Sequence, residues 1–286
     1  MQDTALLAST LALERTTARI EVQCLLQKIL CVERVYLLAH PERKLTDAEY
    51  AHYNSLRQRR IQGEPIAYIL EAREFFGLNL KVTPATLIPR PDSELLVELA
   101  IQRIAGQPHA SVLDLGTGSG AIALAIAHAS PQAKVMATDT STAALAIAKE
   151  NAQTLGIHNI KFAHSNWFAA LGEQRYTLIV TNPPYIAAGD PHLTQGDVRF
   201  EPATALISGQ DGLHDIRQLI QLAPAHLLSG GWLLLEHGYN QAQAVRELLN
   251  KAGFDLVFSA CDIAGIERVS GGQLRANPAY AIALKM

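Results

Sequence analysis

The sequence has few cysteines, few aromatic residues and no long apolar run. Its three cysteines, Cys24, Cys31 and Cys261, are too few and too scattered for a disulfide framework or a zinc site. No histidine has metal-ligand spacing to acids or cysteines, so no metal is expected. No apolar stretch reaches membrane-spanning length, and acidic residues interrupt the N-terminal segment, unlike a signal peptide. These absences predict a reduced, cytoplasmic protein without membrane contact.

The chain also has no excess of positive charge. Its formal net charge is −3, whereas proteins that bind nucleic acid usually carry a basic surface. Arg57, Arg59 and Arg60 form the local basic cluster, and such a run is typical of a solvated helix face. With 286 residues, 49% of them hydrophobic, the chain is long enough for a small domain joined to a large one. No direct contact with nucleic acid is therefore expected.

The first part of the chain has helical periodicity. Leucines recur at helical spacing through residues 1–73, and Thr46 stands three residues before Glu49, which predicts a capping box. Residues 74–90 instead alternate aromatic and β-branched residues around Gly77, which predicts a hairpin connector. The sequence therefore predicts a helical domain over residues 1–73, a connector over 74–90 and a second domain over 91–286.

The second domain alternates helix and strand patterns, which predicts an α/β fold with a doubly wound, mostly parallel sheet. Residues 187–212 are polar and rich in glycine and proline, and are expected to form a functional loop. The expected helices are 93–106, 120–130, 142–156 and 212–230, and the expected strands are 111–115, 133–139, 159–164, 176–182, 231–238 and one near 279–286.

A glycine-rich turn, "DLGTGSG", joins the first of these strands to a helix. Glycines there let a ligand approach the backbone closely, and Asp139, about twenty residues on, ends the next strand where it can accept from ribose hydroxyls. The glycine spacing differs from the dinucleotide fingerprint, and the turn has no lysine for phosphates. A ligand without phosphates, S-adenosylmethionine, suits it better, with contacts from Gly116, Thr117, Gly118, Ser119 and Gly120.

Trp167 follows the third strand of this domain in "SNWF". Its ring has two interpretations, a wall for the adenine or an ordinary core tryptophan that covers the sheet, and position alone does not separate them.

The fourth strand ends in "NPPY", which is Asn182, Pro183, Pro184 and Tyr185. The plain interpretation of the prolines is a strand terminator. Proline restricts the residue before it, so the Asn182 side-chain oxygen and the Pro183 carbonyl are two fixed acceptors for one –NH₂ group, and Tyr185 can cover the planar group that carries it. Such acceptors stabilise the positive charge that develops on a planar nitrogen as it is methylated. Asn182, Pro183 and Tyr185 are the expected catalytic residues.

"DLGTGSG", Asp139 and "NPPY" together resemble the class I S-adenosylmethionine-dependent methyltransferases that modify planar nitrogen. More narrowly, "EPIAYILEAREFFGLNLKVTPATLIPRPDSELLVE", "SNWF", "HLTQGDVRFEPATAL" and "LLLEHG" resemble the peptide-chain release factor glutamine N5-methyltransferases. That resemblance implies a Rossmann-like sheet of seven strands and a helical lobe that helps to grip the release factor.

The resemblance also implies an activity and its residues. The enzyme would methylate N5 of the glutamine in the Gly-Gly-Gln motif of class-1 release factors, in translation termination, and release S-adenosylhomocysteine. Gly116 to Gly120, Asp139, Trp167 and Asn182 would contact the cofactor, and Asn182 to Tyr185 would hold the glutamine amide. A monomer is expected.

Several points stay open. The family pattern has a glycine where Glu71 stands. Arg90 is either part of a rigid helix entry or close to the site. Gly271 to Gln273 repeat the substrate motif, and the two glycines predict a turn between the last two strands. A sister family methylates a ribosomal-protein glutamine, but its connector reads nearer to P-R-S-P than "PRPDSE". A nucleic-acid adenine N6-methyltransferase makes the same demand on "NPPY", and the negative charge argues against it. A non-catalytic binding module is disfavoured by the intact Asn182 to Tyr185.

Overall fold

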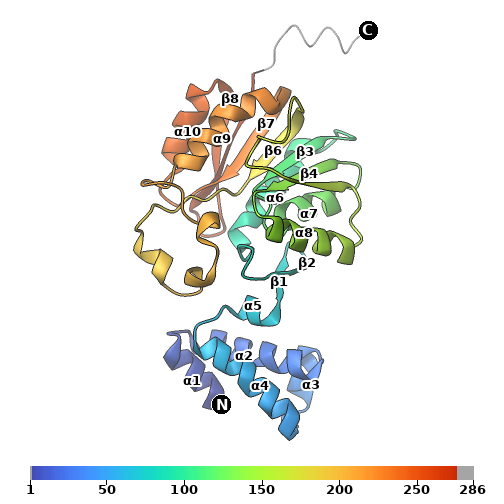
Figure 1. The fold of residues 1–286 in the computed structure, drawn as a ribbon, viewed down its shortest axis with the longest axis vertical. Coiled ribbons are helices and arrows are strands. Elements are labelled where there is room, and N and C mark those ends of the chain that lie inside the picture. The colour runs from blue at the N-terminus through green and yellow to red at the C-terminus, as the bar shows by residue number, and fades with distance from the viewer. Residues whose placement is uncertain (1, 276–286) are drawn as a thin grey trace. The chain divides into compact units, whose positions relative to one another are not determined.

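The computed structural model describes residues 2–275, which form two compact units (Figure 1). Within the described residues, the helical unit is Met1–Arg73 with Pro191–Phe200, and the sheet unit is Glu74–Asp190 with Glu201–Met286. The segment Pro191–Phe200 thus belongs with the helices although it lies between two segments of the sheet unit.

The helical unit packs around a small apolar core. Leu25, Tyr53, Leu56 and Ile69 are buried together in it. The predicted capping box is confirmed, since the backbone N–H of Glu49 donates to Thr46 Oγ1 and the backbone N–H of Thr46 donates to Glu49 Oε2. The helices are α1 (Gln2–Thr10), α2 (Arg15–Leu30), α3 (Arg34–Ala39), α4 (Asp47–Ile61) and α5 (Ile66–Leu70).

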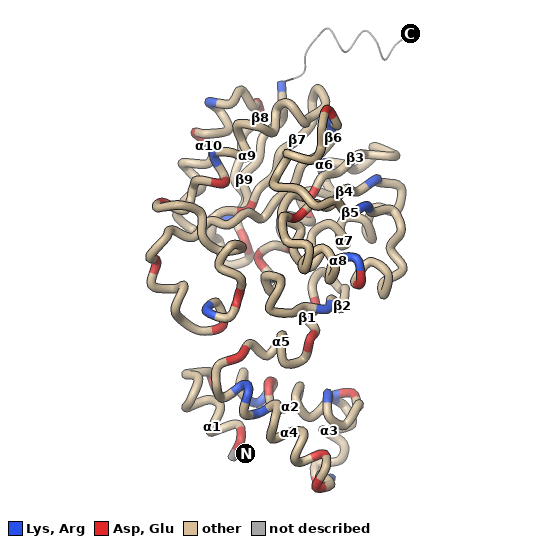
Figure 2. The backbone as a smooth tube through the Cα atoms, in the orientation of Figure 1, with Lys and Arg blue, Asp and Glu red and all other residues tan. Residues whose placement is uncertain are grey.

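Arg60 is buried in this unit, so the expectation of a solvated basic face is wrong for it. Its side chain is 4% exposed and pairs with Glu21 at 2.8 Å and with Asp197 at 3.1 Å. Several basic residues of the unit lie beside acidic ones in Figure 2. A buried guanidinium requires such partners, and Asp197 comes from Pro191–Phe200, so the ion pair fixes that segment to the helices.

A hairpin follows α5. β1 (Ala72–Phe75) and β2 (Leu78–Lys81) form a two-stranded sheet, and Phe76 and Gly77 between them both have positive φ, as a two-residue hairpin turn requires. Glu71 ends α5 with φ of 58°, in the left-handed region that glycine adopts without steric cost. This conformation explains why a glycine is the residue that suits the position.

The sheet unit is built on a mostly parallel sheet, as the strand pattern predicts, with the seven strands that the family resemblance implies. The strand order is β5-β4-β3-β6-β7-β9-β8, and β9 runs antiparallel to both of its neighbours. The strands are β3 (Ser111–Leu115), β4 (Lys134–Asp139), β5 (Ile160–His164), β6 (Tyr176–Thr181), β7 (Leu227–Glu236), β8 (Phe254–Cys261) and β9 (Glu267–Leu274).

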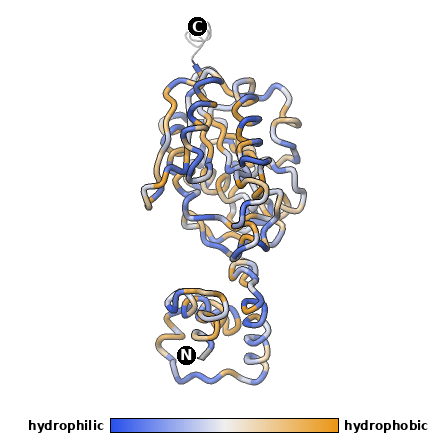
Figure 3. Tube along the Cα trace, turned by 90° about the vertical axis from the view of Figure 1, so that its left-hand side faces the viewer, coloured by the Kyte–Doolittle hydropathy of each residue, from blue (hydrophilic) through white to orange (hydrophobic). Residues whose placement is uncertain are grey.

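Helices cover both faces of this sheet, as a doubly wound fold requires. α6 (Glu94–Ile104), α7 (Ala121–Ala129) and α8 (Thr142–Thr154) share one apolar core with the sheet, and α9 (His214–Leu222) and α10 (Ala242–Lys251) share the other. Figure 3 shows hydrophobic and hydrophilic positions interspersed along the chain. No helix within residues 2–275 has both the length and the apolar character needed to cross a membrane.

Two expectations about the end of the chain are wrong. The expected helix 212–230 stops early, because α9 ends at Leu222 and β7 already begins at Leu227. Gly271 to Gln273 lie within β9 and not in a turn. A Cβ on Gly271 would lie 2.4 Å from Leu234 Cδ2, so this glycine allows close packing. The strand expected near 279–286 lies outside the described residues.

Candidate active site

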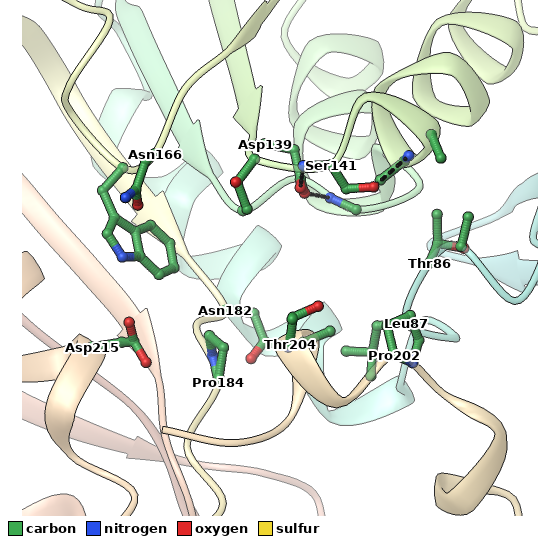
Figure 4. Close-up of a pocket in the computed structure, with 18 of the residues that line it drawn as sticks. Thr86, Leu87, Asp139, Ser141, Asn166, Asn182, Pro184, Pro202, Thr204 and Asp215 are labelled. Carbon is green, nitrogen blue, oxygen red and sulfur yellow. Dashed lines mark hydrogen bonds between the residues drawn. The ribbon is translucent and has the colours of Figure 1, made fainter. Parts of the chain in front are cut away.

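The parallel strands end at one edge of the sheet, beside a cavity. The register pairs Leu115 of β3 with Thr138 of β4 and with Thr181 of β6, so the three strands end level with one another. A cavity of about 520 Å³ opens there, within the range of ligand sites in proteins (Figure 4). Six of the predicted site residues line it, namely Gly116, Gly118, Asp139, Trp167, Asn182 and Pro184.

Some residues of the glycine-rich turn line cavities, and one of its glycines instead allows close helix packing. Gly116 and Gly118 line the cavity with positive φ, and Thr117 and Ser119 line a smaller neighbouring cavity of about 50 Å³. Gly120 lines neither cavity. A Cβ there would lie 2.9 Å from Leu124 Cδ1, so the packing of α7 accounts for this glycine without a ligand.

Asp114 opens the turn and is fully buried behind it. The Thr117 hydroxyl donates to Asp114 Oδ2 at 2.7 Å. Burial raises the pKa of Asp114 to about 7, and the hydrogen bond from Thr117 opposes that rise. Asp114 therefore stabilises the turn from inside the sheet.

Asp139 is held in place by the two backbone segments on either side of it. The backbone N–H of Gly118 donates to its Oδ2, and that of Ser141 donates to its Oδ1, both at 2.8 Å (Figure 4). A carboxylate has about four acceptor positions, so two remain after these bonds. Asp139 is thus oriented at the cavity and keeps acceptors for a ligand with hydroxyl groups.

Trp167 lies at the cavity and against the core at the same time. Its ring lines the cavity and also packs against the core under α9 and α10. A Cβ on Gly116 would lie 3.4 Å from the ring, so the glycine leaves room for it. The neighbouring Asn166, which the sequence analysis did not single out, lines the same cavity.

The orientation of the Asn182 side-chain amide is fixed by a hydrogen bond to Ser93. Its Nδ2 donates to Ser93 Oγ at 3.2 Å, which leaves Oδ1 as the acceptor. Asn182 and Pro184 line the cavity, whereas Pro183 is buried and lines neither cavity. The free side-chain acceptor of the motif therefore belongs to a residue of the cavity wall.

Tyr185 lies differently from what the sequence indicated. Its hydroxyl donates to Glu236 Oε1 at 3.2 Å, its carbonyl accepts from Gln241 Nε2 at 3.0 Å, and the residue does not line the cavity. Burial raises the pKa of Tyr185, and the negative charge of Glu236 raises it further, so the phenol stays a donor. In this structure Tyr185 anchors the turn.

Ser93 and Glu236 are two functional candidates that no sequence pattern indicated. Ser93 Oγ donates to Glu236 Oε2 at 2.5 Å, and both side chains are buried. Burial raises the pKa of Glu236, and the hydrogen bonds from Ser93 and Tyr185 lower it. The available signal was an acid directly after the apolar strand "LLL", at the edge where β7 ends.

Arg90 is part of an ion pair with Glu201. The Arg90 Nη2 to Glu201 Oε1 distance is 2.5 Å, and the Glu201 side chain is fully buried. Arg90 lines the smaller cavity, and Pro202 and Thr204, which follow Glu201, line the larger one. The pair therefore connects the entry of α6 to the segment that carries part of the cavity wall.

Asp215, at the start of α9, also lines the larger cavity and was not foreseen. Its Oδ2 accepts from Ser208 Oγ at 2.7 Å. Among the described residues no cluster of histidine, cysteine or acids could hold a metal ion.

Two family models match this chain. Residues 91–210 match the model "Methyltransferase small domain", and residues 5–70 match "PrmC N-terminal domain". Similar proteins named release factor glutamine methyltransferase come from Pseudomonas aeruginosa (48% identical, 90% of this chain and 93% of the relative), Vibrio cholerae (46%, 96% and 96%) and Bordetella pertussis (50%, 90% and 95%).

One solved structure resembles the fold over most of the chain. It is a methyltransferase from Pyrococcus furiosus, 21% identical, which covers 78% of this chain and 100% of that one with a TM-score of 0.54. At this identity the likeness supports the sheet architecture alone.

Proposed function

The chain belongs to the release factor glutamine methyltransferases, and we propose that it methylates the side-chain amide nitrogen of the glutamine in the Gly-Gly-Gln motif of class-1 peptide chain release factors. The methyl donor is S-adenosylmethionine and the product is S-adenosylhomocysteine. The observation that carries this reaction is the orientation of Asn182, whose Nδ2 is bonded to Ser93 so that Oδ1 is left to accept.

The larger cavity fits the methyl donor by the chemistry of its walls. Asp139 keeps two acceptor positions for a ribose diol, and Trp167 offers a flat apolar surface for adenine. Gly116 and Gly118 expose backbone to the ligand, and no lysine or arginine of residues 2–275 lines this cavity, which suits a ligand without phosphates. When bound, S-adenosylmethionine supplies a methyl group on a positively charged sulfur.

The chain's own residues position and stabilise the acceptor. An amide nitrogen is a poor nucleophile because its lone pair is delocalised. Asn182 Oδ1 on the cavity wall accepts one of its hydrogens, and the backbone carbonyl of Pro183, a buried residue that lines neither cavity, is assigned the other. Together they stabilise the positive charge that grows as the N–C bond forms and the C–S bond breaks. The alkylated nitrogen then loses a proton to solvent, so the motif needs no general base. Pro183 and Pro184 cannot donate, which keeps competing hydrogen bonds away.

The helical unit contributes contacts to the protein substrate. Its residues 5–70 match a domain model named for this family's N-terminal domain. The substrate is an intact release factor, the enzyme acts as a monomer in the cytoplasm, and it does not bind nucleic acid directly. A free peptide that contains the acceptor glutamine reacts poorly, because a flexible loop must be ordered on binding and gains no contact with the helical unit.

The test uses purified enzyme, labelled S-adenosylmethionine and three substrates. They are an intact class-1 release factor, the same factor with alanine in place of the motif glutamine, and a ribosomal fraction. We expect label on the intact factor only, and mass spectrometry should place one methyl group on the glutamine side chain. Label on a ribosomal protein would support the sister activity, and label on RNA would overturn the protein substrate.

A further inference from the structure

Asn182 is the first member of a hydrogen-bonded chain that ends on a buried carboxylate. Asn182 Nδ2 donates to Ser93 Oγ at 3.2 Å, and Ser93 Oγ donates to Glu236 Oε2 at 2.5 Å. The other carboxylate oxygen, Glu236 Oε1, accepts from the Tyr185 hydroxyl at 3.2 Å. Glu236 thus bonds directly to Tyr185 at one end of the Asn182–Tyr185 turn, and through the Ser93 hydroxyl to Asn182 at the other end.

The direction of these bonds follows from the chemistry of the groups. Both Glu236 oxygens accept hydroxyl hydrogens, Oε2 from Ser93 and Oε1 from Tyr185, so neither oxygen donates and the Ser93 hydroxyl is used as a donor. Ser93 Oγ then offers only lone pairs to Asn182, which must present its NH₂ group. The amide orientation is therefore imposed by Glu236, although the two side chains do not bond to each other.

Burial keeps water from replacing these hydrogen bonds. Ser93 is 3% exposed and Glu236 is 1% exposed, so bulk water does not compete for either group. Asp92 beside Ser93 and Arg268 of β9 are the nearby charges that act on Glu236, in opposite directions. A turned amide of Asn182 would present NH₂ to the NH₂ of a glutamine, and such a pair cannot form a hydrogen bond.

We propose that Glu236 is a positioning residue that acts through Ser93 to fix the Asn182 amide with its oxygen toward the acceptor nitrogen. The inference rests on the proposed function, because it assigns the polarity of that acceptor site. Glu236 lines neither the larger nor the smaller cavity.

Glu236→Gln is the informative change, because it keeps the shape and adds a donor. A glutamine at this position can turn its own NH₂ toward Ser93, so the hydroxyl can then donate to Asn182 Oδ1 and both orientations of the Asn182 amide become available. Ser93→Ala removes the relay itself and deletes only one oxygen, so the fold should survive. Asp255→Asn is the control, since Asp255 is a half-buried acid on β8, far in sequence from Glu236, that pairs with Arg275.

The measurements are kcat, KM for the intact release factor and Kd for S-adenosylmethionine, with melting curves for each variant. We expect kcat to fall about tenfold to a hundredfold for Glu236→Gln and for Ser93→Ala, as for loss of a preorganised group. KM and Kd should stay within about threefold, because orientation of the acceptor matters most at the transition state. The double variant should be no slower than the slower single variant, because both act on one chain of bonds. The control should match the wild type.

The outcomes separate the two hypotheses. No methylation by the wild-type enzyme would refute the proposed function. An active wild type with an unchanged kcat in Glu236→Gln or Ser93→Ala would overturn the positioning role, and so would a double variant that loses the product of the two single effects. If Glu236→Gln does not fold, Ser93→Ala decides alone, since a retained kcat there means that the relay does not orient Asn182.

Discussion

Replacing Asp139 with asparagine removes one charge and turns one of two acceptor oxygens into a donor. Oδ1 and Oδ2 each accept a backbone N–H, from Ser141 and Gly118, at 2.8 Å, so an amide must face one of these N–H groups with its own NH₂. A hydrogen bond to a charged group contributes about 1.5–3 kcal/mol. The free energy of unfolding should therefore fall by about 1.5–3 kcal/mol, which urea unfolding measures.

The same change should weaken cofactor binding, because the ribose loses a charged acceptor. Loss of about 1.5–3 kcal/mol corresponds to a Kd for S-adenosylmethionine that is roughly 10- to 150-fold higher, which calorimetry measures. Thr46→Ala is the control, since loss of the α4 cap should cost about 1 kcal/mol of stability without affecting the Kd. An unchanged Kd in Asp139→Asn would refute the ribose assignment, and unchanged stability would refute the role of the carboxylate in holding the turn.

Three further changes have defined outcomes. Asn182→Ala should lower single-turnover methylation about a hundredfold or more with the fold intact by circular dichroism, and an active variant would remove Asn182 from the mechanism. Glu71→Gly should raise the free energy of unfolding by about 0.5–1 kcal/mol by relieving a left-handed backbone, and a loss of stability would mean that contacts of Glu71 outweigh the relief. Gln273 should stay unmethylated after long incubation with the cofactor alone, because its Nε2 donates to Gly230 O at 2.8 Å, and intact mass would reveal an added methyl group.

The parts of the site that could be predicted are those that follow directly from a strand. Gly116, Asp139 and Asn182 each come at or just after the end of a parallel strand, and parallel strands bring their ends to one edge. The strand pattern alone therefore brings these residues together. The capping box of α4 could be predicted for a similar reason, since both of its residues lie within one turn of helix.

The parts that could not be predicted depend on residues far apart in the chain. Ser93 and Glu236 are 143 positions apart, and no local pattern shows that their side chains meet. Gly271 suggested a turn, because sequence alone does not separate a glycine needed for positive φ from one needed for close packing. Arg60 suggested a solvated position because its partner Asp197 is 137 positions away.

The segment Pro191–Phe200 determines how the two units are connected. The chain passes between them at Arg73–Glu74, at Asp190–Pro191 and at Phe200–Glu201. The helical unit is therefore formed by two separate stretches of chain, and after one proteolytic cut following Arg73 the stretch Pro191–Phe200 would still contact residues 1–73, through contacts that include the Arg60–Asp197 ion pair. A chimera that replaces residues 191–200 but keeps Arg60 must also keep Asp197, or it leaves this buried guanidinium without one of its counterions. Exchange of the helical unit between relatives thus requires two separate stretches of sequence to change together.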